Sequence, residues 1–243
     1  MTTRKVSQMS SARSVGGFDL FLKRVFTLMF GAVGITAVAA YLTIWGGGLR
    51  YLISFTPSGV GFNALYYIIL FGGLALSIWA QIRAFSMRPG MGAAMLILYA
   101  VLVGVGITPL VAVALSVNPA SILWAFIIAA AMFACMALFG YKTVRDLSFL
   151  GIFLTMGMIG LILVGIVSFF VPLGGTFATI VCLLGVLIFA LFTAYDMQSL
   201  KRAYAAIGGD DRTSGQLAVL GALHLYISFI AMFQYLLSLL NRN

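Results

Sequence analysis

The sequence predicts an all-α integral membrane protein built as a bundle of seven transmembrane helices. Its 243 residues are 63% hydrophobic and only 8% charged, and the mean hydropathy is +1.15. A soluble protein of this length would need far more polar surface to cover its core. The hydrophobic runs are also too continuous for the alternating strands of a membrane barrel. We therefore expect every span to be a helix.

Seven runs are long enough to cross roughly 30 Å of hydrocarbon at about 20 residues each. They are expected near 26–45, 63–82, 92–115, 121–140, 148–171, 176–195 and 216–240. Residues 1–25 are expected to form a polar cytoplasmic tail, and residues 26–243 a single transmembrane domain. Two longer loops, 46–61 and 197–215, are rich in Gly and Ser, which predicts flexible and solvated segments.

The distribution of Lys and Arg predicts the orientation. Of the 14 basic residues, all but Arg50 and Arg242 fall in the N-terminal region or in the second, fourth and sixth loops. Cytoplasmic segments carry the excess of basic residues, so the N-terminus is expected to be cytoplasmic and the C-terminus outside. This topology also explains the net charge of +9. The lipid bilayer is therefore the expected partner, and no nucleic-acid partner is expected.

One acidic residue stands out. From Leu147 to Tyr195 no side chain is expected to carry charge at neutral pH, and Asp196 follows directly at the end of the sixth span. Removing a carboxylate from water costs several kcal/mol unless something compensates, so an ionisable group in or beside a span is a candidate functional residue. Asp196 is therefore the first candidate site residue.

Several chemistries are excluded by residue type. All four Lys lie in tails or loops, so no span offers the buried amine of a retinal Schiff base. His224 is the only histidine, Cys135 and Cys182 are far apart in the sequence, and the chain contains no Glu. This set does not form a soft-metal site or a serine protease site. We expect neither an enzyme nor a bound cofactor.

Three stretches carry a resemblance to a known family. They are GYKTVRDLSFLGIFL at 140–154, LGVLIFALFTAYDMQSLK at 184–201 and GALHLYISFIAMFQYLLSLL at 221–240. In this order and spacing they resemble the last four helices of the Bax inhibitor-1 family (transmembrane Bax inhibitor motif proteins). The first helix, entered through FLKRVFTLMFGAVGITAVAAYL, is similar to that of bacterial members. The resemblance covers about residues 18–241.

The resemblance implies a seven-helix bundle with a central last helix and a pH-dependent calcium leak. In the family, two aspartates form a proton-sensing latch, and the first position matches Asp196. The second lies in the family's LYLDF, which here reads LYISF, so Ser228 replaces that aspartate. A basic residue at the end of the second helix is associated with the latch, and Arg83 is the nearest candidate. Calcium is then the transported ion, with Asp196 as its candidate ligand.

The change to Ser228 removes the coupling between two carboxylates that share a proton. His224 lies one helical turn before Ser228 on the same face and titrates near neutral pH in its ordinary state. One hypothesis is that an Asp196/His224 pair replaces the two-aspartate latch. The alternative is that His224 only makes hydrogen bonds within the helix core.

Two function classes remain open. The first is a cation leak carried by Asp196 and regulated by proton binding. The second is a non-transporting membrane protein that binds and modulates another membrane protein, such as a membrane-anchored protease. The expected location is the inner membrane of a bacterium. The alternative is a mitochondrial or other organelle membrane, because the first 17 residues are rich in Ser and Arg and free of acidic residues.

Overall fold

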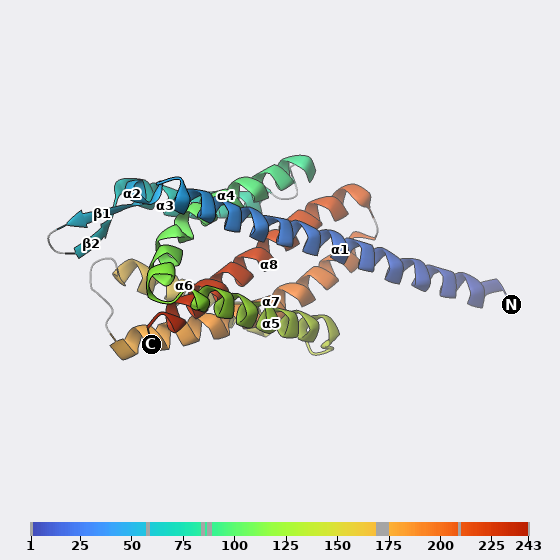
Figure 1. The fold of residues 1–243 in the computed structure, drawn as a ribbon. Helices are drawn as coiled ribbons and strands as arrows, with labels where there is room; N and C mark the ends of the chain where they lie inside the picture. Colours follow the sequence, from blue (N-terminus) through green and yellow to red (C-terminus); the bar gives the residue numbers. More distant parts are fainter. Residues whose placement is uncertain are drawn as a thin grey trace.

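A computed structural model of the chain describes residues 2–56, 59–83, 86, 89–168, 175–208 and 210–242. In this part of the chain the helices are α1 (Thr2–Trp45), α2 (Leu49–Leu52), α3 (Ala64–Arg83), α4 (Pro89–Val117), α5 (Ala120–Lys142), α6 (Ser148–Ser168), α7 (Gly175–Ile207) and α8 (Asp211–Leu240). The strands are β1 (Ile53–Thr56) and β2 (Gly59–Phe62). Seven of the described helices, all but α2, are long and apolar enough to cross a membrane. The predicted seven-helix fold is confirmed (Figure 1).

Helix α8 occupies the middle of the bundle (Figure 1). It packs against α1, α4, α5 and α7, and 67% of its most hydrophobic stretch is buried inside the protein. The corresponding values are 11% for α3, which packs mainly on α4, and 17% for α6, which packs on α7. The expected central position of the last helix is therefore confirmed, and α3 and α6 are peripheral.

Helix α7 continues well beyond its apolar span, so the loop predicted at 197–215 is wrong. The helix ends at Ile207 and α8 begins at Asp211. No Gly or Pro interrupts the chain after the apolar run until Gly208, whose φ of +66° is the left-handed conformation that commonly ends helices. The fall in hydropathy after residue 195 therefore marks the end of the apolar stretch and not the end of the helix.

Helix α1 likewise runs through most of the segment expected to be a polar tail. Near the start of its apolar stretch, Phe18 and Phe21 pack against Tyr204 in the extension of α7, with ring centroids 5.1 and 4.6 Å apart. These aromatic contacts bury large apolar surfaces where both helices leave the apolar core. The end of the bundle that carries the basic loops is thus held together by side-chain packing.

The loop predicted at 46–61 contains regular structure. Helix α2 is followed by an antiparallel hairpin in which Ile53 pairs with Phe62. The side chain of Asn63 donates to the backbone carbonyls of Tyr51 and Ile53, at 3.2 and 3.3 Å. These bonds tie the base of the hairpin to the start of α3.

The contact between α5 and α7 leads to a first prediction. A Cβ at Gly140 would lie 2.2 Å from the carbonyl oxygen of Ala194, so Gly140→Ala must push two helix backbones apart. We expect a loss of about 1–3 kcal/mol in the free energy of unfolding, read as a lower midpoint of thermal unfolding in detergent. Gly160→Ala is the matched control, because a Cβ at Gly160 meets nothing within 4 Å. Equal effects of the two substitutions would contradict the prediction.

Candidate functional site

Asp196 lies within α7 and faces the central helix α8. Its side chain is only 12% exposed. One carboxylate oxygen, Oδ2, accepts a long hydrogen bond of 3.5 Å from the hydroxyl of Ser228. The other, Oδ1, lies 3.9 Å from Nδ1 of His224. The carboxylate is thus enclosed between two helices, as a charged group at this depth requires.

His224 connects this carboxylate to a third helix. Its second ring nitrogen, Nε2, lies 3.1 Å from Oε1 of Gln81 on α3. The amide nitrogen of Gln81 donates to the backbone carbonyl of Ser77 at 3.2 Å, which orients the amide oxygen toward the imidazole. The ring therefore has an oxygen acceptor on each side, and only the doubly protonated imidazolium can donate toward both. We call Asp196, Ser228, His224 and Gln81 the polar link, because they connect α7, α8 and α3.

The structure brings together three of the four residues proposed from the sequence, namely Asp196, His224 and Ser228. Arg83 is the last residue of α3 and is exposed. The ion pairs among the described residues are Arg202 with Asp146 and His224 with Asp196, and Arg83 takes part in neither. The functional role of each residue stays a prediction.

Gln81 was missed by the sequence analysis. It lies two residues before Arg83, and successive residues of a helix point about 100° apart, so the two side chains leave α3 in different directions. The available signal was the pair Ser77 and Gln81, two polar residues one turn apart in an otherwise apolar span.

A cavity of about 340 Å³ lies between α3, α4 and α8. Its polar lining comes from Tyr66, Tyr99, Tyr226 and Gln234. The lining includes Ile227 of α8, three residues from His224, and Leu74 of α3, seven residues from Gln81. Spacings of three or four residues, and of seven, keep side chains on one helix face. The contact between Gln81 and His224 thus lies on the same helix faces as the cavity, at the end near the basic loops.

The site is not a preformed metal centre. Among the residues that the structure describes, no group of three or more His, Cys, Asp or Glu side chains could hold a metal ion. The carboxylate of Asp196 and the hydroxyl of Ser228 are the neighbouring oxygen donors, whereas calcium takes six to eight. A calcium ion at Asp196 would therefore need water or backbone ligands as well.

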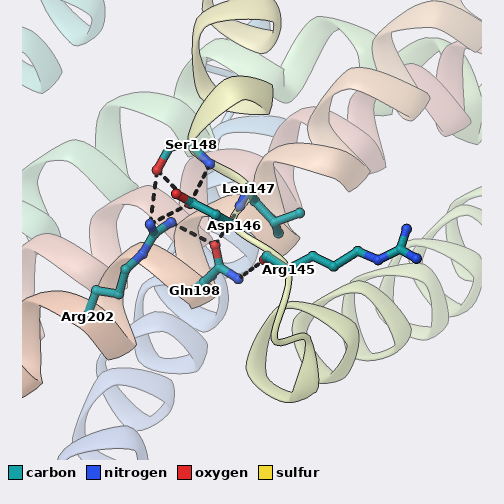
Figure 2. Close-up of polar contacts among 6 residues, drawn as sticks. All are labelled: Arg145, Asp146, Leu147, Ser148, Gln198 and Arg202. Carbon is teal, nitrogen blue, oxygen red and sulfur yellow. Dashed lines mark hydrogen bonds and ion pairs between the residues drawn. The ribbon is translucent and has the colours of Figure 1, made fainter.

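A second polar network begins two residues further along α7, at Gln198, and extends to Arg202 (Figure 2). The side chain of Gln198 accepts from the backbone N–H of Leu147 at 2.9 Å and donates to the carbonyl of Arg145 at 2.7 Å. Arg202 donates to the carboxylate of Asp146 at 2.6 Å and to Oε1 of Gln198 at 2.7 Å. These bonds hold the α5–α6 loop against α7, close to Asp196 in sequence.

Comparison with known proteins agrees with this architecture. The model of the family described as "Inhibitor of apoptosis-promoting Bax1" matches residues 19–243. The chain belongs to the Bax inhibitor-1 family. This confirms the resemblance found in the sequence, and the match extends over all seven spans.

Its relatives are bacterial proteins of similar length. An uncharacterized protein of Caulobacter vibrioides is 35% identical over 93% of this chain and 90% of its own. The inner membrane protein YbhL of Escherichia coli K12 is 31% identical over 91% of each chain. A membrane protein of Streptococcus pyogenes is 26% identical over 93% of this chain and 94% of its own. The similarity thus spans more than nine tenths of this chain in each of these bacterial relatives.

Proposed function

We propose that this family member is a proton-regulated cation leak of a bacterial inner membrane, with calcium as the transported ion. Family membership over residues 19–243, an E. coli relative named as an inner membrane protein and seven helices long enough to span a membrane support it.

One observation carries the proposal. An enclosed carboxylate, Asp196, lies 3.9 Å from the only histidine of the chain, and that histidine reaches Gln81 of α3 at 3.1 Å. Groups that connect three spans through a residue able to titrate near neutral pH can change helix contacts with pH. Among the described residues, His224 pairs with Asp196 and Gln81, and of these two only Asp196 can ionise.

The direction of regulation follows from these contacts. When the imidazole is protonated it attracts Asp196 and donates to Gln81, which holds α3 to the centre of the bundle. When it loses its proton the ion pair is lost, and one ring nitrogen no longer donates. Helix α3 is then held mainly by α4, and the cavity beside it gains a route toward Asp196. The leak should therefore increase as pH rises through the titration of His224.

Calcium flux tests the proposal directly. Purified protein in liposomes is expected to pass calcium at a rate that rises between pH 6 and pH 8, measured with a calcium-sensitive dye inside the vesicles. Protein-free liposomes give the background. Flux at the background level throughout this range would overturn the leak and favour the alternative of a non-transporting partner protein.

Restoring the family's second aspartate should strengthen calcium binding. The hydroxyl of Ser228 already contacts the Asp196 carboxylate, so Ser228→Asp places a second hard oxygen ligand beside the first. We expect the dissociation constant for calcium at pH 7.5 to fall by about tenfold, equivalent to about 1.4 kcal/mol, in equilibrium titrations.

Ser116→Asp is the matched control, because it adds the same charge at an exposed position near the end of α4. If both variants bind calcium equally well, the gain comes from net charge and the proposed ligand pair is wrong.

A further inference from the structure

The α5–α6 loop presents apolar side chains to its surroundings at the end of two spans. Val144 is 99% exposed, and Phe149, in the first turn of α6, is 81% exposed. The spans end at Lys142 and begin again at Ser148, so both side chains lie near the boundary between hydrocarbon and water. Apolar groups at this depth are stabilised by entering the boundary between headgroups and acyl chains.

The loop that carries these side chains is fixed in place. Gln198 pairs with the backbone of Arg145 and of Leu147, and Arg202 reaches the carboxylate of Asp146 (Figure 2). The Ser148 side chain and backbone N–H also donate to this carboxylate, at 2.7 and 2.9 Å. The loop is therefore a preformed surface held on α7.

The charge of this surface is positive. The Ser148 hydroxyl and backbone N–H, with help from Arg202, lower the pKa of Asp146 to about 2, so it stays ionised at neutral pH and Arg202 neutralises it. The three remaining basic residues, Lys142, Arg145 and Lys201, form no ion pair with any described acidic residue.

Lys142 ends α5, Arg145 lies in the loop that follows, and Lys201 reaches the end of α5 from α7. Lys201 donates to the carbonyl of Tyr141 at 3.1 Å and lies 5.0 Å from the centre of its ring, which holds the ammonium at the end of α5. Lys142 is the next residue and is exposed. The side chain of Arg145 extends away from the network (Figure 2).

We propose that this surface, formed by Lys142, Val144, Arg145, Phe149 and Lys201, is a binding site for an anionic phospholipid. Val144 and Phe149 enter the apolar boundary beside the acyl chains, while the three cations contact the phosphate of the headgroup. A soluble anion would use the cations alone and would leave the two apolar side chains in water. The combination of exposed apolar groups and uncompensated charge therefore favours a lipid.

Lipid binding by the full-length protein in detergent tests the proposal, with native mass spectrometry as the measurement. Phosphatidylglycerol should bind more tightly than phosphatidylcholine. Each Lys or Arg near an anionic lipid surface contributes about fivefold in affinity, so the triple variant Lys142→Gln, Arg145→Gln, Lys201→Gln should bind phosphatidylglycerol about a hundredfold more weakly. Arg145→Glu alone, at an exposed position, should also weaken binding without affecting the fold.

The matched control is Arg50→Gln with Arg242→Gln, which removes basic residues from the other end of the bundle and should leave the affinity unchanged. Affinity for phosphatidylglycerol within twofold of the original in the triple variant would overturn the proposal. Competition by inorganic phosphate at equal concentration would overturn it too, because it would identify a soluble-anion site. The assay measures no ion flux, so its outcome is independent of the cation leak.

Discussion

Asp196→Asn is expected to lower calcium flux through liposomes on the order of a hundredfold at pH 8. A cation that passes the polar link would lose its only nearby carboxylate, since Ser228 and Gln81 are neutral and His224 is the remaining titratable contact. A unit charge at 4 Å contributes about 4 kcal/mol at an effective dielectric constant near 20. About two thirds of this value, applied to the barrier, gives the expected loss.

Asp19→Asn is the matched control, because it removes an equal charge from an exposed position on α1 and should leave the flux unchanged. The asparagine at 196 can keep the hydrogen bond from Ser228, so the midpoint of thermal unfolding should change little. Unchanged flux in a folded Asp196→Asn variant would show that calcium does not pass this carboxylate.

The seven spans were predictable because their signal is local. Runs of about 20 apolar residues predict helices wherever they occur in a membrane protein, and all seven are present. The extension of α7 was not predictable from hydropathy, because residues 196–207 lie beyond the apolar run, and Tyr204 there packs on Phe18 and Phe21, far away in the sequence. Membrane boundaries and helix boundaries are set by different forces.

The residues of the site also divide into those that the local sequence predicts and one that only the packing of distant helices brings in. The proximity of His224 to Ser228 follows from helix geometry. The proximity of Asp196 to Ser228 was expected from the family resemblance, in which these two positions form the latch. Gln81 contacts His224 across 143 positions of sequence, and no local pattern specifies that α3 turns this side chain and not Arg83 toward α8. The hypothesis of an Asp196/His224 pair therefore has geometric support, while its role in gating depends on the next prediction.

His224→Gln is expected to flatten the pH dependence of calcium flux between pH 6 and pH 8 to less than about twofold. His224 is the only histidine of the chain, and a step that requires the loss of one proton changes by at most about tenfold per pH unit. Glutamine keeps a polar side chain opposite Gln81 and Asp196, so the bundle should stay folded. The measurement is the ratio of flux at pH 8 to flux at pH 6.

Gln234→Leu is the control for this experiment. Gln234 lines the cavity on α8 and lies ten residues from His224, so the variant should keep the original ratio even if its absolute flux changes. Gln81→Leu should give an intermediate result, because it leaves the ion pair with Asp196 but removes the acceptor on α3. A steep pH response in His224→Gln would mean that another group senses protons, and would leave His224 as a residue that only joins α8 to α3.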